Sequence, residues 1–426
     1  MRPLGVLVAD GGELYFSHDP DFLANPLPVS PFVLPPGPQL YQHNDAAFDR
    51  LPGLFFDALP DGWGRLLQDR AFTRLGVSRA DITPLDRLAA IGDGGIGALS
   101  FAPSIDLNAR EDNGWAWSPD LAALADHAAR IYDGSGEEVL PQLLAGGGSP
   151  GGAHPKVLAG VRLNADGSAA VHAGGASALS GRASDLPSGY APWIIKFPTH
   201  EEGTDAGAIE AAYARMARAA GIPMPDTRLF AAGDRRYFGI ARFDRHGPDF
   251  AERVHMHTLG GLVHADYRLP SLDYRDYLSV AYQLIGGSMP AVEDAFRRML
   301  FNVLAHNRDD HVRNFAFLMS PDGVWRHSPA YDLTFTTGPN GEHTTAIAGE
   351  GRAPTLQHIH AVADSADLSR RRADAILEEV DDSVGSWKKH ARSVELSATT
   401  ASRIAKQLDA VRRAVFGNVT ATREPI

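Results

Sequence analysis

Hydrophobic and polar positions alternate in short runs over the first part of the chain, with Gly and Pro turns between the runs. The runs at 5–9, 13–16 and 97–101 predict strands, because each is a short apolar stretch bounded by turn residues. Residues 1–104 are therefore expected to form a small β-rich domain.

A helix-spaced pattern of apolar residues interrupts this domain at residues 54–72. Its aromatic side chains Phe55, Phe56 and Trp63 indicate core packing more readily than a ligand pocket. The four glycines within 92–97 predict a turn between a helix end and a strand, with phosphate binding as the rarer alternative.

Residues 104–118 are polar and irregular, which indicates a domain boundary, and an alanine- and leucine-rich helix is expected at 119–132. Five glycines follow within residues 146–152. Glycines let backbone N–H groups turn towards a phosphate without interference from a Cβ, although such a loop can also be a plain flexible turn. The lysine and hydroxyl residue of a Walker motif are absent, which disfavours a P-loop NTPase.

An apolar strand is predicted at 192–198 with a single charge, Lys196, embedded in it. An unpaired charge there would cost several kcal/mol, roughly, so it needs either an anion or an exposed strand end. The next amphipathic helix, expected at 204–220, carries Glu210 in its first turns, where it could pair with Lys196 or remain solvated.

Two more strands are expected at 228–231 and 236–245, so residues 105–260 predict a sheet with one helix, as in the small lobe of a kinase. Residues 261–426 predict a mostly helical region. Its clearest helical patterns lie at 291–305, 368–380 and 398–415.

Composition narrows the function classes. The chain of 426 residues has 44% hydrophobic and 22% charged residues, which is typical of a globular protein of two or three domains. A net charge of −12 disfavours unaided binding to nucleic acid or anionic membranes. The lack of cysteine excludes disulfides and thiolate sites and fits a cytoplasmic location. No run of eighteen apolar residues occurs, and the N-terminus predicts a strand, so neither a membrane span nor a secretory signal is expected.

The strongest chemical signal lies in residues 304–318. Asp309 and Asn314 have the Asp-x-x-x-x-Asn spacing of a protein-kinase catalytic loop, and Arg308 completes an Arg-Asp pair. Asp332 follows eighteen residues after Asn314. Phosphoryl transfer needs such a set, because one carboxylate activates the attacking hydroxyl while an amide oxygen and a second carboxylate hold Mg²⁺.

The same segment also permits a metal-dependent hydrolase built on His306, Asp309, Asp310 and His311. Adjacent residues point in different directions on a regular element, however, so these four rarely converge on one ion. His306 and Asp310 are therefore expected to be bystanders.

Taken together, these motifs resemble the HipA family of bacterial serine/threonine kinases, which are the toxins of toxin–antitoxin pairs. The likeness covers nearly the whole chain and rests on matching stretches at 55–64, 90–99, 151–156, 195–197, 241–245, 307–315 and 328–332. It implies an α+β fold, in which a small β-rich N-terminal domain precedes a two-lobed kinase-like fold with a largely helical C-terminal lobe.

The resemblance implies a role for each matched residue. Asp309 would be the catalytic base, Asn314 and Asp332 would bind Mg²⁺, and Lys196 would hold the phosphates of ATP. Other residues would line the nucleotide site, with backbone groups of two of them facing adenine: Gly151, Gly152, Ala153, His154, Lys156, Glu210, Ala241, Phe243, His311 and Tyr331. Ser149 would be the serine on which the enzyme phosphorylates and silences itself.

The resemblance also implies partners. These are a protein substrate, with glutamyl-tRNA synthetase as the best-known example, and a helix-turn-helix antitoxin of the HipB type through which any DNA contact would run. Two departures from the family pattern bear on this expectation. Arg308 stands where the family usually has a small or hydroxylated residue, so it is expected to alter substrate contacts near the γ-phosphate. His154-Pro155 replaces more flexible or polar residues of the loop, which disfavours phosphorylation of Ser149.

Two alternatives to a protein kinase stay open. One is a nucleotide-binding module that acts through a partner without turnover, and the other is a small-molecule phosphotransferase with the same catalytic residues. The small-molecule phosphotransferase is less favoured, because the chain has an additional N-terminal domain. Nucleotide binding without phosphate transfer would favour the nucleotide-binding module.

Overall fold

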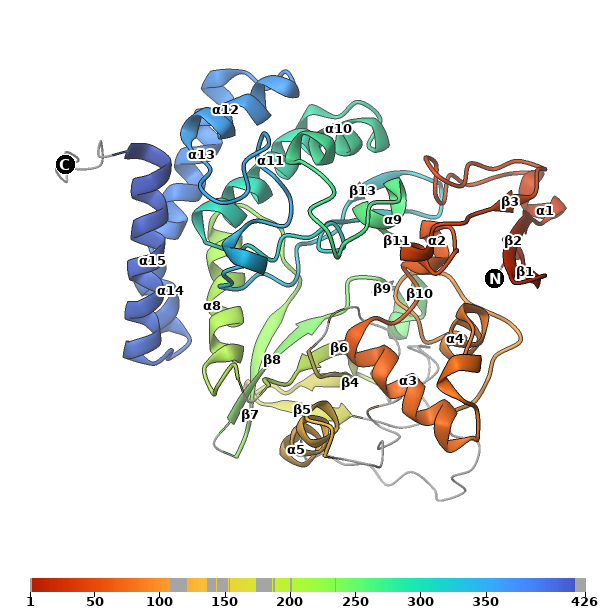
Figure 1. Cartoon of the computed structure of the whole chain (residues 1–426). Helices are drawn as coiled ribbons and strands as arrows, with labels where there is room; N and C mark the ends of the chain where they lie inside the picture. Colours follow the sequence, from red (N-terminus) through yellow and green to blue (C-terminus); the bar gives the residue numbers. More distant parts are fainter. Residues whose placement is uncertain are drawn as a thin grey trace.

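The computed structural model describes residues 2–107, 121–135, 143, 152, 154–173, 186, 188–199, 201–233 and 235–417. A β-rich N-terminal part, a central five-stranded sheet and a helical C-terminal part follow one another along the chain (Figure 1). This confirms the expected α+β fold, while the predicted domain limits stay predictions. Among the described residues, no helix is both long and apolar enough to cross a membrane.

The N-terminal part contains a small antiparallel sheet in the order β1-β2-β3. Its strands are β1 (Gly5–Asp10), β2 (Glu13–His18) and β3 (Tyr41–Gln42), and its helices are α1 (Pro20–Leu23), α2 (Gly53–Phe56), α3 (Gly62–Arg74) and α4 (Pro84–Ile91). The first two strands confirm the predicted runs, and Phe55, Phe56 and Trp63 are buried as expected.

The single helix predicted at 54–72 is wrong, because the chain leaves the helix after Phe56 and re-enters one at Gly62. Pro60 lies in the gap. Proline has no N–H to donate and disfavours helical geometry in the residue before it, so it separates α2 from α3.

The strand predicted at 97–101 is also absent from the described residues. Its backbone groups bond to side chains instead of a neighbouring strand. Gly97 donates its N–H to Asp244 and accepts from Arg245, while Arg253 bonds the carbonyl oxygens of Gly97 and Leu99. These contacts attach the end of the N-terminal part to the central region.

The central antiparallel sheet has the order β5-β4-β6-β8-β7. Its strands are β4 (Lys156–Leu163), β5 (Ala169–Ala173), β6 (Ala191–Lys196), β7 (Thr227–Ala232) and β8 (Arg235–Ala241). They confirm the strands expected around 192–198 and 228–231, whereas the strand expected at 236–245 ends at Ala241. The register places Lys156 directly opposite Lys196.

Helices cover both faces of this sheet. α8 (Ala206–Ala219) buries Tyr213 and Met216 towards the helical part. Against the other side, α3 and α5 (Leu121–Tyr132) form one apolar cluster with the sheet, in which Trp63 and Leu124 pack with Trp193. α3, a helix of the N-terminal part, therefore packs directly against the central sheet (Figure 1).

The C-terminal part combines helices with a second small sheet. Strands β11 (His255–Thr258), β12 (Ala316–Met319) and β13 (Trp325–His327) pair in this order, and β9 (Arg245–His246) pairs with β10 (Glu252–Arg253). The helices are α9 (Leu259–Val263), α10 (Tyr274–Leu284), α11 (Met289–Leu304), α12 (Leu356–Ser365), α13 (Arg370–Gly385), α14 (Trp387–Ser393) and α15 (Ala398–Phe416). α11, α13 and α15 confirm the three predicted helices.

The last helices pack against the back of α8. Ser383 on α13 donates to the carbonyl oxygen of Met216 (2.7 Å), and the ring of Trp387 on α14 lies 5.6 Å from that of Tyr213. Thr400 on α15 donates to Asp205, just before α8 (2.6 Å). α8 is thus held between the central sheet and the C-terminal helices.

The N-terminal part also touches α9 backbone to backbone. A Cβ at Gly53 would lie only 2.0 Å from the carbonyl oxygen of Gly261, so this approach requires glycine. Next to it, Asp57 accepts hydrogen bonds from the Thr258 N–H (2.7 Å) and hydroxyl (2.8 Å) and from His257 Nδ1 (2.6 Å).

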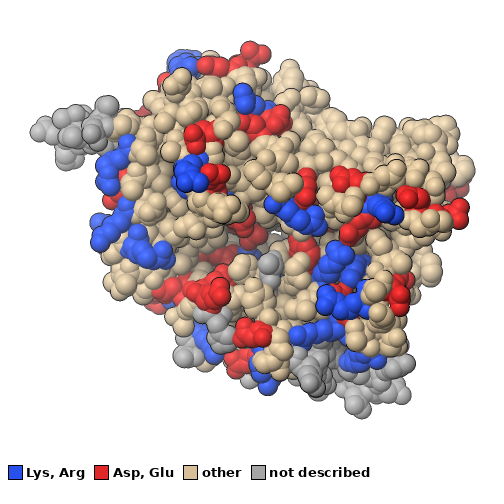
Figure 2. All heavy atoms as spheres, viewed as in Figure 1, with Lys and Arg blue, Asp and Glu red and all other residues tan. Residues whose placement is uncertain are grey.

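Charged side chains of both signs are interspersed over the face shown in Figure 2. The net charge of −12 is therefore not collected into one acidic surface in this view.

We predict that the stability of the fold falls as the pH drops from 6.5 towards 4. His255 is buried, and its Nε2 donates to the Val29 carbonyl oxygen (2.8 Å); burial, and then His257, lower its pKa to about 4. Between pH 6.5 and 4 the unfolded chain therefore binds more protons than the folded chain. This difference lowers the free energy of unfolding by up to about 3 kcal/mol for each such histidine.

Urea unfolding at several pH values measures this effect. The variant His255→Gln is expected to lose stability less steeply between pH 6.5 and 4, whereas His246→Gln, at an exposed position, should keep the wild-type slope. An unchanged slope in His255→Gln would contradict the prediction.

Candidate active site

A cavity of about 140 Å³ lies where the central sheet, the segment after α11 and the N-terminal part meet. The structure brings most of the predicted nucleotide-site residues to its wall: Gly152, Lys156, Lys196, Ala241, Phe243, His311, Asn314, Tyr331 and Asp332. Residues separated by up to 180 positions in the sequence thus share one concave site.

Lys196, at the end of β6, is the central charge of this site. Its Nζ lies 2.6 Å from Glu210 Oε2 and 2.5 Å from Asp332 Oδ1, and its side chain is only 16% exposed. The predicted pair with Glu210 is therefore present. Burial alone would lower the pKa of Lys196, but the charges of Asp332 and Glu210 raise it, so the ammonium group stays protonated.

Lys156 adds a second cation from the neighbouring strand. Its side chain is buried opposite Lys196, and burial lowers its pKa despite the nearby charges of Asp332 and Asp61. Like charges on facing strand positions repel, so the pair needs the carboxylates around it. The result is a cavity wall with two lysines, which suits the phosphates of a nucleotide.

Asp332 faces both lysines from the loop after β13. Burial would raise its pKa, but Lys196 and then Lys156 hold it well below the usual range, so the carboxylate is ionised. Its backbone has a φ of +58°, in the left-handed region that is unfavourable for most residues. Such conformations are concentrated at functional sites, where the surrounding structure imposes them.

Asp309 and Asn314 close a tight loop beside the cavity. Asn314 Nδ2 donates to the Asp309 carbonyl oxygen (2.7 Å), while the Asp309 side chain is 52% exposed and lies 4.0 Å from His311 Nε2. Partial burial raises the pKa of Asp309, and the charge of Asp332 adds to this effect while that of His311 opposes it. A carboxylate with a raised pKa is a better proton acceptor.

Two other residues of this loop, Asp310 and His306, serve the fold. Asp310 is buried and accepts from the Tyr274 hydroxyl (2.7 Å), His343 Nδ1 (2.7 Å) and the Thr344 N–H (2.8 Å). His306 stacks on Phe335 with ring centroids 5.2 Å apart. Their side chains are used by these contacts, as expected of bystanders.

No group of three or more His, Cys, Asp or Glu side chains within the described ranges is arranged to hold a metal ion. The hydrolase cluster on His306, Asp309, Asp310 and His311 is therefore not formed by these residues. Mg²⁺ on a nucleotide needs fewer protein ligands, because phosphates and water complete its octahedron. Asn314 and Asp332 line the cavity and offer the oxygen atoms that Mg²⁺ prefers.

The cavity wall also carries aromatic side chains, whose ring faces can pack against a nucleobase. Tyr331 and Phe243 stack there with ring centroids 5.8 Å apart, and the Tyr331 hydroxyl donates to the Arg313 carbonyl oxygen (2.6 Å). The N–H of Ala241 already donates to Asp226 (2.8 Å). Of its backbone groups, only the carbonyl oxygen of Ala241 could contact a base.

Several predicted residues lie elsewhere. His154 pairs with Glu202, with Nδ1 and Oε2 3.2 Å apart, and Glu210 acts through Lys196; neither lines the cavity. Arg308 donates to the carbonyl oxygens of Gly341 and Arg352, so its guanidinium is held by that loop. Ser149, Gly151 and Ala153 lie outside the described residues.

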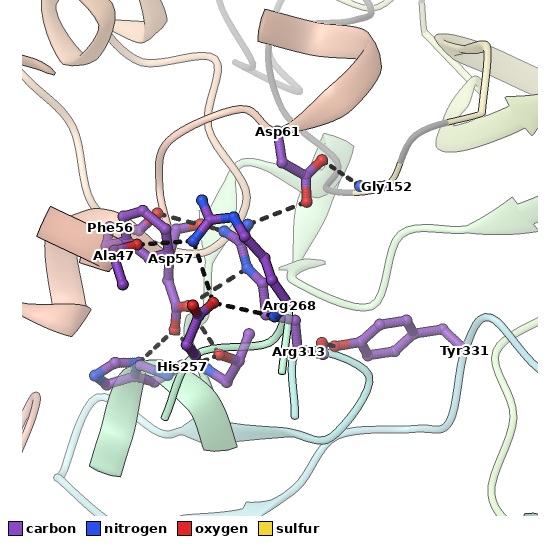
Figure 3. A network of polar contacts seen from close by, with 12 residues as sticks. Ala47, Phe56, Asp57, Asp61, Gly152, His257, Arg268, Arg313 and Tyr331 are labelled. Atoms are coloured by element: carbon purple, nitrogen blue, oxygen red, sulfur yellow. Dashed lines mark hydrogen bonds and ion pairs between the residues drawn. The ribbon is translucent and has the colours of Figure 1, made fainter. Parts of the chain in front are cut away.

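Three cavity residues of the N-terminal part, Asp57, Asp61 and Ile96, were not predicted from the sequence. Nor was Arg313, which donates through Nη1 to Asp61 Oδ2 (3.0 Å) and lies near Asp57 (Figure 3). The only signal was the acidic stretch between α2 and α3, and no periodicity connects it with residues 250 positions away.

Ile96 lines the cavity, and hydrogen bonds to the adjacent residues Gly95 and Gly97 fix its position. Arg242 and Arg245 both donate to the Gly95 carbonyl oxygen and both pair with Asp244. Burial opposes ionisation of Asp244, but the two guanidinium groups hold its pKa well below the usual range. The Arg-Phe-Asp-Arg motif thus fixes a segment of the N-terminal part at the wall of the cavity.

We predict opposite results for two neighbouring aspartates. Asp310→Ala should lower the free energy of unfolding by about 3 kcal/mol or more, because it leaves buried donors without an acceptor. Asp309→Ala should change it by less than about 1 kcal/mol, because that side chain is half-exposed. Chemical denaturation of both variants measures the difference, and equal losses would contradict the assignment.

Comparison with known proteins gives a consistent picture. Residues 1–102 match the HipA N-terminal domain, and residues 148–388, more than half of the chain, match the HipA-like C-terminal domain. No curated protein matches the sequence.

Two solved structures are similar to the chain. One is from the complex of the Shewanella oneidensis MR-1 toxin–antitoxin system HipA, HipB and its operator DNA, with a TM-score of 0.69 and 19% identity over 97% of this chain and 95% of that chain. The other is the Helicobacter pylori proinflammatory kinase CtkA, with a TM-score of 0.25 and 11% identity over 50% of this chain and 92% of that chain.

Proposed function

The chain belongs to the HipA family, and from this membership and the site we propose that it is an ATP-dependent serine/threonine protein kinase of the HipA toxin type. One observation carries the proposal. Lys196 contacts both Glu210 and Asp332 at a cavity that also holds Asn314, with Asp309 beside it.

Each of these residues has a task in phosphoryl transfer. Glu210 holds the Lys196 ammonium group, which then donates to phosphate oxygens of ATP, and Lys156 adds positive charge beneath them. Asn314 and Asp332 present oxygen ligands. Mg²⁺, when bound there, offsets the negative charge that develops on the phosphates.

Asp309 completes the reaction. The hydroxyl oxygen of a serine or threonine forms a bond to the γ-phosphorus, the bond to the β,γ-bridging oxygen breaks, and ADP leaves. The hydroxyl proton goes to the Asp309 carboxylate, which half-exposure leaves within reach of a protein substrate.

We further propose that a DNA-binding antitoxin of the HipB type neutralises the enzyme. The similar Shewanella oneidensis structure is a complex with HipB and operator DNA. The net charge of −12 agrees with a DNA contact made through such a partner and not by this chain alone. The protein target is proposed to be an aminoacyl-tRNA synthetase, with glutamyl-tRNA synthetase as the first to test, and Ser149 is the proposed site of self-phosphorylation.

Incubation with Mg·[γ-³²P]ATP is expected to label the protein, and mass spectrometry should locate the label on Ser149. Asp309→Asn and Asp332→Ala should reduce transfer at least about a thousandfold, since each removes a group essential to the transition state. Asp409→Asn, at an exposed position on α15, is the matched control and should retain transfer. Full activity of Asp309→Asn would refute the role of this carboxylate.

Calorimetric titration with Mg·ATP tests the nucleotide site separately. Lys196→Met should weaken binding roughly 10- to 100-fold, because it removes charge-assisted contacts to phosphate. Wild-type binding without any transfer to proteins would favour the nucleotide-binding module, and transfer only to small hydroxyl compounds would favour a small-molecule phosphotransferase.

A further inference from the structure

We propose that Asp61, from the N-terminal part, is a positioning residue that fixes the two sides of the phosphate site relative to each other. The inference rests on the proposed function and extends it. It assigns a task in phosphoryl transfer to a residue outside the kinase-like region.

The side chain of Asp61 does not cap the helix that it precedes. Asp61 is the N-cap residue of α3, and aspartate is among the preferred N-caps because its carboxylate accepts from the first turn of the helix. Here it makes no such bond. Its carboxylate points away from α3 and into the gap between two other segments (Figure 3).

One oxygen of this carboxylate binds the end of the glycine-rich segment, as Oδ1 accepts from the Gly152 N–H. The same turn holds this segment twice more. The Trp63 N–H donates to the Gly152 carbonyl oxygen (3.4 Å), and Trp63 Nε1 donates to the Lys156 carbonyl oxygen (3.1 Å). Residues 61–63 therefore set the path of the backbone that leads into β4.

This path brings the backbone of Gly152 against the side chain of Lys156. Gly152 has a φ of +112°, and a Cβ there would lie 2.5 Å from Lys156 Nζ. The backbone of Gly152 thus lies directly over the ammonium group of Lys156. A shift of this backbone changes the position of a cation that faces Asp332 in the cavity.

The other oxygen of Asp61 binds the catalytic segment. Oδ2 accepts from Arg313 Nη1 (3.0 Å), and the Arg313 side chain is only 10% exposed. Its guanidinium lies over the rings of Phe56 (5.2 Å) and Tyr267 (5.0 Å), which fix its orientation. Arg313 directly precedes Asn314, and its carbonyl oxygen accepts from Tyr331, the residue before Asp332.

The single carboxylate of Asp61 therefore joins Gly152, which leads into β4 and Lys156, to the segment that carries Asn314. Loss of this bridge removes an acceptor from a buried guanidinium and from a backbone N–H at once. Catalysis depends on such distances, because a displacement of about 1 Å can cost on the order of 100-fold in rate.

Hydrogen exchange tests the bridge without any need for catalysis. In the full-length protein without nucleotide, Asp61→Ala is expected to raise amide exchange in peptides that cover 152–158 and 310–316 at least about tenfold. Asp86→Asn, which removes an acidic residue from the capping box of α4 in the same domain, should leave both peptides unchanged. Unchanged exchange in Asp61→Ala would overturn the inference.

Kinetics supply the second readout. Asp61→Ala and Arg313→Ala should each raise the KM for ATP and lower kcat, with kcat/KM reduced roughly 10- to 100-fold, and the double variant should lose little more than either single one. Additive losses would overturn the bridge. Where Asp61→Ala does not fold, Asp61→Asn keeps the acceptor for Gly152 and should weaken only the contact with Arg313.

The two proposals fail in different ways. Absence of phosphate transfer by the wild-type protein, together with the expected exchange pattern, would reject the kinase and retain the bridge. Transfer by the wild type with no effect of Asp61→Ala on exchange or kinetics would retain the kinase and reject the bridge.

Discussion

The contact of the Lys196 ammonium group with two carboxylates is the interaction around which the site is organised. A lone charge at the buried end of β6 would be unstable, so Glu210 from α8 and Asp332 from the loop after β13 must reach it. One charge thereby joins the central sheet, its flanking helix and the C-terminal part. The strained backbone of Asp332 is tolerated because this contact holds it.

The N-terminal part is a component of the site and not an appended module. It contributes α3 to the core of the central sheet and Ile96 and Asp61 to the cavity. The hydrogen bonds of Gly95 and Gly97 to the Arg242, Asp244 and Arg245 cluster attach it at one place, and the approach of Gly53 to Gly261 beside the Asp57 contacts attaches it at a second. These contacts couple the position of the N-terminal part to the cavity whose wall it helps to form.

The sequence predicted the parts of the site that local pattern can reveal. An isolated lysine in an apolar strand indicated Lys196 and its partner Glu210, and the Asp-x-x-x-x-Asn spacing indicated Asp309 and Asn314. It missed features that depend on distant contacts. The carboxylate of Asp61 binds groups about 90 and 250 residues away, and residues 97–101 bond to side chains where a strand was expected. Periodicity holds no information about such contacts.

The packing of α13, α14 and α15 against α8 has a consequence for the Lys196 and Glu210 pair. Glu210 pairs with Lys196 from a helix that packs against the central sheet on one side and against the C-terminal helices on the other. Rotation of this helix, a common on-off mechanism in two-lobed kinases, would have to break the C-terminal packing first. Any displacement of Glu210 away from Lys196 is therefore coupled to the positions of α13, α14 and α15.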